Sequence, residues 1–164
     1  MEVGKARAVV EGLKEAGVNF AAGLPDSQFH EVYELIAEDP SFKYVGVGNE
    51  AEGAAVAMGA WFGGKKPVLL IATSGLLVAT FSLARLHLKE VPLLVVIPYR
   101  GDLGDPRWMG IYKQFTEPML DAMDIPYRVV QQPTELKKAI VDCQVCTEKW
   151  IKPVAVLITG EALW

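Results

Sequence analysis

Apolar positions along the chain alternate between a helical period and short uninterrupted runs. Residues 3–16 carry a stripe of apolar side chains at helical spacing, which predicts a first helix that ends at Gly17. Six mostly apolar runs are typical of buried strands. They span residues 18–22, 43–47, 67–72, 93–97, 127–130 and 153–158. The segments between them predict helices over 28–38, 50–62, 76–89, 113–123 and 134–150, with Thr134 as the N-cap of the last.

Strands of this kind separated by helices indicate a doubly wound α/β fold, with a mainly parallel six-stranded sheet and helices on both faces. The length fits one domain over residues 1–164, and we see no linker, repeat or low-complexity segment. Ligands of such sheets bind beyond the carboxyl ends of the strands. That rule selects four segments for chemistry, 23–27, 48–53, 73–76 and 98–113.

Composition narrows the class of protein. Apolar residues make up 51% and charged residues 22%, and this apolar excess favours a surface that another chain buries. A formal net charge of −4 argues against a nucleic-acid partner. No apolar run of about 18 residues predicts a membrane span. The first residues carry charges throughout, unlike a signal peptide, so we expect a cytoplasmic location.

Glu50 is the first candidate for chemistry, because it follows a strand and opens a helix. The structural alternative is an N-terminal cap, in which Asn49 is the N-cap and Glu52 reaches back toward it. The helix after Glu50 is rich in Ala and Gly, which allows another backbone to approach closely. Glu50 is therefore either a helix-terminal residue or a catalytic acid.

Two further turns carry polar candidates. The turn Gly23-Leu24-Pro25-Asp26-Ser27 either caps the next helix or places a carboxylate where a substrate would bind, with His30 close behind it. The segment Thr73-Ser74-Gly75-Leu76 opens a helix whose free N–H groups can bind an anion. The chain contains neither a P-loop nor a G-x-G-x-x-G motif.

The long loop over 99–112 supplies two arginines. Arg100 and Arg107 suit a carboxylate, sulfonate or phosphonate group, unless they pair with Asp102 or Asp105, and Lys113 is a weaker candidate. Cys143 and Cys146 form a C-x-x-C within a predicted helix, which favours structural thiols over a redox or metal site. We predict no metal ligands in this chain, and a packed position for His87.

Four motifs, taken in order, point to a family. They are G-L-P-D-S, N-E-x-E-G-A-A-V-A-x-G-A, G-K-K-P-V-L-L-x-x-x-S-G-L and V-P-L-L-V-V-I-x-x-R-G-D-L-G. Together they resemble the alpha subunit of sulfopyruvate decarboxylase and are similar to the N-terminal half of phosphonopyruvate decarboxylase. The resemblance covers nearly the whole chain. It implies the pyrimidine-binding (PYR) domain of an enzyme that uses thiamine diphosphate (ThDP).

The resemblance implies the alpha subunit of a two-chain 2-oxo acid decarboxylase, a lyase that converts 3-sulfopyruvate to sulfoacetaldehyde and CO₂. Phosphonopyruvate or another 2-oxo acid is the alternative substrate. The family's Gly-Asp-Gly…Asn-Asn signature for diphosphate and Mg²⁺ is absent here. A beta subunit carrying the diphosphate-binding (PP) domain is therefore implied, in a hetero-oligomer such as α2β2 or larger. A non-catalytic α/β scaffold or binding subunit is the alternative from a different class.

The family roles carry over at matching positions. Glu50 matches the glutamate that hydrogen-bonds N1′ of the aminopyrimidine, and Asp26 matches the aspartate that lines the substrate pocket. The resemblance implies that Pro25, Ser74 and Gly75 border the bound cofactor. The substrate-binding positions implied are Ser27, His30, Arg100 and Arg107.

Two departures from the family pattern border the expected substrate pocket. Leu77 replaces the glycine of S-G-L-G and no Asn follows it. Arg107-Trp108 precede Met109-Gly110, where the family often carries a Gln. Both leave the choice of 2-oxo acid open.

Overall fold

The computed structural model describes residues 2–101 and 105–164. Its sheet has six strands in the order β2-β1-β3-β4-β6-β5, and all five neighbouring pairs are parallel. The strands are β1 Phe20–Gly23, β2 Lys43–Gly46, β3 Pro67–Leu70, β4 Leu93–Tyr99, β5 Tyr127–Val130 and β6 Pro153–Thr159. The predicted doubly wound parallel sheet is confirmed.

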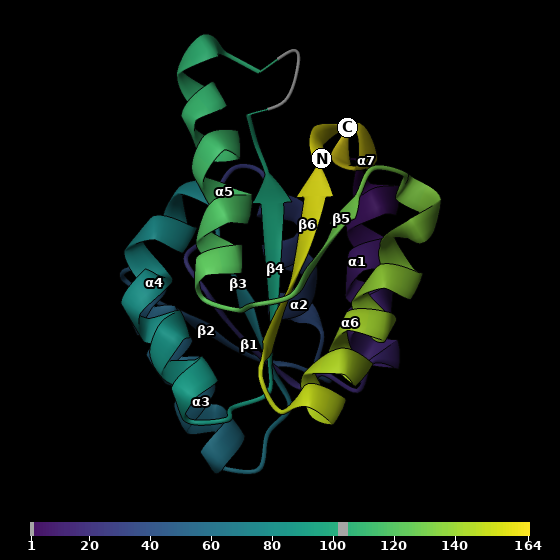
Figure 1. The fold of residues 1–164 in the computed structure, drawn as a ribbon. Coiled ribbons are helices and arrows are strands. Elements are labelled where there is room, and N and C mark those ends of the chain that lie inside the picture. Colours follow the sequence, from purple (N-terminus) through teal and green to yellow (C-terminus); the bar gives the residue numbers. More distant parts are fainter. Residues whose placement is uncertain (1, 102–104) are drawn as a thin grey trace.

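Helices cover both faces of the sheet (Figure 1). They are α1 Val3–Glu15, α2 His30–Glu38, α3 Glu50–Phe62, α4 Thr73–Leu88, α5 Gly110–Ala122, α6 Leu136–Trp150 and α7 Gly160–Leu163. Two 3-10 turns, η1 Arg107–Met109 and η2 Pro133–Glu135, precede α5 and α6. Figure 1 shows α1 and α6 on one side of the strands and α3, α4 and α5 on the other.

Each face of the sheet has its own buried core. Val68 and Leu70 of β3 join the core that packs α1, α2 and α6, whereas Leu69 between them joins the core that packs α3, α4 and α5. Alternate residues of a strand point to opposite faces, so strands buried on both sides must be apolar throughout. This is why the fully buried strands β3, β4 and β6 appear in the sequence as uninterrupted apolar runs.

Several predicted boundaries differ from the structure. β1 begins at Phe20 because Val18 still belongs to the end of α1, where its N–H donates to the carbonyl of Leu13 over 3.0 Å. α4 begins at Thr73, three residues before the predicted start, so Ser74 and Gly75 lie in its first turn. The predicted loop over 99–112 is shorter, since η1 and the start of α5 occupy its second half.

The prediction that Thr134 caps the last long helix was wrong. Thr134 lies inside η2, and α6 begins after Glu135, which makes no side-chain cap hydrogen bond. Pro133 explains the shift, because its fixed φ favours the first position of a helical turn. The short helix α7 was not predicted, since four residues are too few to show a helical period.

Candidate active site

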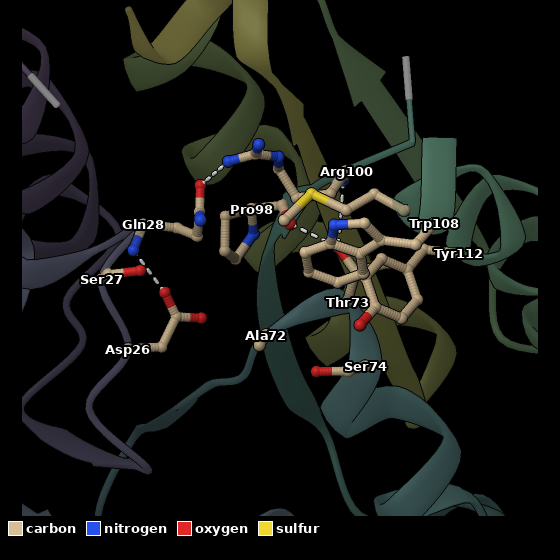
Figure 2. Close-up of a pocket in the computed structure, with 11 residues that line it drawn as sticks. Asp26, Ser27, Gln28, Ala72, Thr73, Ser74, Pro98, Arg100, Trp108 and Tyr112 are labelled. Atoms are coloured by element: carbon tan, nitrogen blue, oxygen red, sulfur yellow. Dashed lines mark hydrogen bonds between the residues drawn. The ribbon is translucent and has the colours of Figure 1, made fainter. Parts of the chain in front are cut away.

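A pocket of about 250 Å³ lies where β1, β3 and β4 end. Figure 2 shows Asp26 and Gln28 on one side of it and Trp108 and Tyr112 on the other. Four of the predicted site residues line the pocket: Asp26, Ser27, Ser74 and Arg100. The carboxyl edge of the parallel sheet thus brings together side chains that lie up to 74 positions apart in the sequence.

Glu50 lies next to this pocket, packed over Gly75. Its side chain is buried, at 9% exposed, although it opens α3. A Cβ built on Gly75 would lie 2.4 Å from Cγ and 2.5 Å from Oε1 of Glu50. Any side chain at position 75 would therefore clash with the Glu50 carboxyl group, which packs against the first turn of α4. Within the described ranges, that carboxyl group makes no hydrogen bond or ion pair.

The predicted capping arrangement beside Glu50 is confirmed. The side-chain oxygen of Asn49 accepts a hydrogen bond from the backbone N–H of Glu52 over 2.9 Å. The Glu52 carboxylate in turn accepts the backbone N–H of Gly48 over 2.6 Å. Because its neighbours cap α3, the side chain of Glu50 is not needed for that purpose.

Asp26 stands in the pocket wall with its carboxylate accepting the backbone N–H of Gln28 over 2.5 Å. Burial raises the pKa of Asp26 above its ordinary value of 3.8. The backbone N–H groups of Gln28 and Phe29 and the charge of Arg100 act in the opposite direction without cancelling that effect. A carboxyl group of this kind is suited to exchanging a proton with a bound molecule.

Two buried hydroxyls tie the strand ends together. Thr73 donates to the carbonyl of Pro98 over 2.5 Å and accepts the backbone N–H of Arg100 over 3.1 Å, which joins α4 to the end of β4. Tyr33 lies within 2.8 Å of the carbonyl of Leu24 and 3.0 Å of that of Leu70, which joins the ends of β1 and β3. These hydrogen bonds fix the segments that carry the pocket residues.

Gly23 makes the Tyr33 contact possible. A Cβ at Gly23 would lie 2.5 Å from the carbonyl oxygen of Leu70 and 2.9 Å from the hydroxyl of Tyr33. Burial is the main reason that the pKa of Tyr33 is raised, with the charges of Asp26 and Glu50 contributing. The tyrosine is therefore a neutral hydrogen-bond donor to the strand ends.

Arg100 pairs within its own chain, as the structural alternative in the sequence predicted. Its guanidinium binds both oxygens of Asp105, with Nε at 3.0 Å from Oδ2, and its Nη1 donates to the side-chain oxygen of Gln28. The ring of Trp164 lies over the guanidinium at 5.0 Å. Asp102, the other predicted partner, lies outside the described residues.

The remaining predicted residues lie outside the pocket lining. Arg107 is exposed in η1, Pro25 is exposed, and His30 faces solvent with its ring nitrogen 3.2 Å from Glu34. Lys113 lies over the ring of Tyr99 at 5.9 Å. Of the departures from the family pattern, Trp108 lines the pocket, whereas Arg107 does not and Leu77 is 45% exposed on α4.

The two cysteines lie far along α6 and not in the pocket. Both are free thiols, and burial raises the pKa of Cys143 to about 12. His87 is half-buried, 3.7 Å from a carboxylate oxygen of Asp124. Across residues 2–101 and 105–164, no three His, Cys, Asp or Glu side chains gather closely enough to hold a metal ion. No helix in those ranges could cross a membrane.

Several pocket residues were missed by the sequence reasoning. Gln28, Pro98 and Tyr112 line the pocket, but none belongs to a recognisable motif. Gln28 follows directly after the turn that was singled out, and Tyr112 closes the loop over 98–113, so position alone could have suggested them. Their orientation depends on tertiary packing that has no sequence signal.

Comparisons with known proteins agree with this geometry. Residues 4–125 match the family of thiamine pyrophosphate (TPP, the same molecule as ThDP) enzymes, in its N-terminal TPP binding domain. The chain is 32% identical to sulfopyruvate decarboxylase subunit alpha of Methanothermobacter thermautotrophicus, over 96% of this chain and 97% of the relative. It is also 32% identical to the same subunit of Methanococcus maripaludis, over 92% of each chain.

Two further similarities are partial. Phosphonopyruvate decarboxylase of Streptomyces viridochromogenes is 33% identical over 83% of this chain but only 35% of its own length. A solved 2-oxoglutarate:ferredoxin oxidoreductase from Magnetococcus marinus superposes on 98% of this chain and 29% of its own, with a TM-score of 0.79 and 22% identity. At that identity the likeness supports the fold alone.

Proposed function

The chain belongs to the thiamine pyrophosphate enzymes, as their N-terminal TPP-binding domain, and on that premise we propose that residues 1–164 form the PYR domain of a two-chain 2-oxo acid decarboxylase. Its end-to-end relatives make it an alpha-type subunit of a ThDP-dependent decarboxylase, a lyase. We propose 3-sulfopyruvate as the substrate, with sulfoacetaldehyde and CO₂ as products. Phosphonopyruvate or another 2-oxo acid is the second candidate, favoured by the Streptomyces relative and by the changed residues Arg107 and Trp108.

The observation that carries the proposal is the buried carboxyl group of Glu50 lying over Gly75. Asn49 and Glu52 already cap α3, so a scaffold protein has no evident use for a buried acid at position 50. An acid with no hydrogen-bonding partner in the described ranges can bind a ring nitrogen presented from outside the chain. These observations fit the pyrimidine of ThDP, which Glu50, Ser74, Gly75 and Pro25 would hold.

When bound, the cofactor supplies the decarboxylation chemistry at its thiazolium carbon. Glu50 would share a proton between its Oε atom and N1′ of the pyrimidine. Burial of the carboxyl group would keep water away from this contact. The Gly75 position lets the carboxyl group reach the ring without a side chain in its path.

Asp26 would exchange a proton with the reacting part of the substrate. Its carboxyl group is held by the N–H of Gln28 and has a raised pKa caused by burial, which increases the protonated fraction near neutral pH. Ser27 adds a hydroxyl to the same wall. The Thr73 and Tyr33 hydrogen bonds hold this wall at a fixed distance from α4.

Positive charge would select an acid with a second anionic group. Arg100 lies in the pocket wall, while Arg107 and His30 are exposed outside its lining and would reach a substrate only in the assembled enzyme. Direct contact of Arg107 and His30 with the substrate stays a prediction, whereas the hydrogen bonds of Arg100 to Asp105 and Gln28 favour an indirect role. The cytoplasmic location also stays a prediction.

We propose that the partner is a beta subunit whose PP domain holds the diphosphate and Mg²⁺. The relatives are named as alpha subunits, which implies a second chain. The outer face of α4 is apolar, with Val78, Phe81 and Leu88 exposed by 55%, 72% and 78%. Its N-terminal turn carries Ser74 and Gly75, so a chain that covered this face would also reach the cofactor site. We call Leu77, Val78, Phe81 and Leu88 the α4 face.

Reconstitution tests the proposal. The chain would be combined with a beta subunit that carries the Gly-Asp-Gly…Asn-Asn signature, with ThDP and Mg²⁺, and assayed for CO₂ release from a panel of 2-oxo acids. We expect turnover of 3-sulfopyruvate above that of phosphonopyruvate and pyruvate. Absence of turnover on every acid in the panel by an assembled, cofactor-loaded complex would refute the decarboxylase function.

A further inference from the structure

Gln28 occupies the wall of the pocket between two charged side chains. Its backbone N–H donates to Asp26, and its side-chain oxygen accepts a hydrogen bond from Arg100. Figure 2 shows its amide between the guanidinium and the Asp26 carboxylate. We infer that Gln28 binds the substrate directly through its amide N–H₂, and that Arg100 is a positioning residue that acts through Gln28. The inference rests on the proposed function.

The hydrogen bond from Arg100 determines which end of the Gln28 amide is available. A guanidinium has donors only, so it must face the amide oxygen and not the amide nitrogen. The nitrogen, with its two hydrogens, is therefore turned away from Arg100. It makes no hydrogen bond to any residue in the ranges that the structure describes. Two oriented donors remain for a ligand in the pocket.

Arg100 itself is poorly placed to bind a second anion. Its Nε and Nη2 donate to Asp105, its Nη1 donates to Gln28, and Trp164 stacks on the guanidinium. The positive charge is already balanced by Asp105, whose side chain is 15% exposed. An anion that approached the guanidinium would also meet the Asp105 carboxylate, so direct binding of the anion to Arg100 is weakened.

The loop geometry keeps Arg100 in this arrangement. Asp105 also accepts the backbone N–H of Gly101 over 2.8 Å, and Gly101 has a φ of +106° that favours glycine. A Cβ at Gly101 would lie 2.8 Å from the carbonyl oxygen of Met109. Trp164 is held through its carbonyl by Lys5 over 2.8 Å. Arg100 is thus fixed from three directions and, in turn, fixes the Gln28 amide.

The chemistry recognised is an oxyanion of the substrate. A neutral amide donor polarised by a guanidinium behind it makes a strong hydrogen bond to a carboxylate or sulfonate oxygen. Losing one hydrogen bond to a charged group costs about 1.5–3 kcal/mol, which corresponds to a roughly 10- to 100-fold loss of affinity.

The test is a double-mutant cycle on the assembled, cofactor-loaded enzyme. Gln28→Met keeps the side-chain length and removes both amide ends, Arg100→Lys keeps a donor toward residue 28, and the double variant combines them. The readouts are kcat and KM for 3-sulfopyruvate and the Kd of unreactive 3-sulfopropionate measured by calorimetry. Gln131→Met, at an exposed glutamine, is the matched control, and thermal unfolding checks that each variant is folded.

We expect Gln28→Met to raise KM and the 3-sulfopropionate Kd by roughly 10- to 100-fold with kcat changed less than about 3-fold, because uniform binding is lost. Arg100→Lys should raise both values less, and should add less than about 2-fold in the Gln28→Met background. Wild-type KM and Kd in a folded Gln28→Met enzyme would overturn the inference while leaving the decarboxylase function standing. Fully multiplicative effects would also overturn it, because Arg100 would then bind the anion itself.

The two proposals fail separately. If no 2-oxo acid is turned over, the proposed function fails. If 3-sulfopropionate then still binds and its Kd rises in Gln28→Met, the assignment of Gln28 as an anion donor is upheld by binding alone.

Discussion

The two helical layers bury the sheet equally well but present different surfaces to solvent. On the α1, α2 and α6 side, outer residues form ion pairs, with Lys14 2.7 Å from Asp39 and Lys137 2.7 Å from Glu15. On the other side, the α4 face carries exposed apolar side chains and Phe62 at the end of α3 is 65% exposed. Exposed ion pairs contribute little to stability, whereas exposed apolar area is normally covered by a partner.

The difference indicates which face of the sheet we expect a partner to cover. The charged layer, formed by α1, α2 and α6, carries ion pairs on its outer side, although Val145 and Trp150 of α6 are 41% and 53% exposed. The opposite layer, formed by α3, α4 and α5, is the apolar layer. It begins at the helix turns that carry Glu50 and Gly75, so the candidate site and the uncovered surface are continuous. Association with a partner and assembly of the cofactor site would then be a single event.

A charge introduced into the α4 face should have the largest effect on association and activity. Phe81 is 72% exposed, with Arg85 over its ring at 5.8 Å. We expect Phe81→Glu to weaken association with the beta subunit by at least about 30-fold, the loss typical of a buried aromatic contact, and to abolish activity with it. Analytical ultracentrifugation of the mixed chains measures the association.

Val145→Glu on α6 is the matched control, since Val145 is also apolar and 41% exposed but lies on the other layer. It should leave association unchanged. Equal effects of the two substitutions would remove the distinction between the layers.

The next largest effect concerns the glycine beneath Glu50. In Gly75→Ala the new Cβ would overlap the Glu50 carboxyl group, so the side chain must move away from its present position. A displacement of about 1 Å in a catalytic group can cost about 100-fold in rate, and we expect a loss of that order in kcat. Steady-state kinetics of the assembled enzyme provides the measurement.

Gly4→Ala is the control for the same chemical change, because a Cβ there meets nothing within 4 Å. Its activity should equal that of the wild type, with stability raised by up to about 1 kcal/mol through helix propensity. Full activity in Gly75→Ala would mean that the Glu50–Gly75 contact has no part in catalysis.

The smallest expected effect is on thermal stability, and it differs in sign between the carboxyl groups of Asp26 and Asp39. Burial raises the pKa of Asp26, so the folded chain loses stability as pH rises from its ordinary value of 3.8 through the raised value. Asp26→Asn should therefore raise Tm at pH 7 by at most a few degrees, and the difference should vanish below pH 3.8. Scanning calorimetry over a pH series tests this.

Asp39 on the charged layer should behave in the opposite way. Hydrogen bonding to Lys14 is the main cause that lowers the pKa of Asp39 to about 2, so its ionised form stabilises the fold above pH 3.8 and the benefit is lost as pH falls toward 2. Asp39→Asn should lower Tm at pH 7 slightly. A rise in both variants, or in neither, would contradict the assignment of the two environments.

The sequence was a good guide to elements and a poor one to contacts. Mostly apolar runs predicted all six strands, and the runs are uninterrupted in β3, β4 and β6, where burial on both faces excludes polar residues. Helix starts at Thr73 and Leu136 were misplaced because local hydrogen bonds and Pro133 set them. The sequence left Glu50 open between cap and catalyst, and the Arg100–Asp105 pair open between structure and substrate.

Tertiary proximity explains what could not be predicted. Gln28 and Arg100 are 72 positions apart, and Trp164, which stacks on that arginine, directly follows a helix too short to show a period. The contact of Glu50 with Gly75 depends on the crossing of α3 and α4. No local pattern encodes such contacts, whereas the order of the motifs pointed correctly to the family.

Proton exchange at the thiazolium C2 of ThDP, measured by NMR in D₂O on the assembled enzyme with Mg²⁺, tests the role of Glu50 most directly. Glu50→Gln keeps the shape of the side chain and removes the ionisable group. Exchange should slow by at least about 100-fold, the contribution typical of a positioned acid or base, with thermal unfolding unchanged. Exchange at the wild-type rate in a folded, cofactor-loaded Glu50→Gln enzyme would contradict the account.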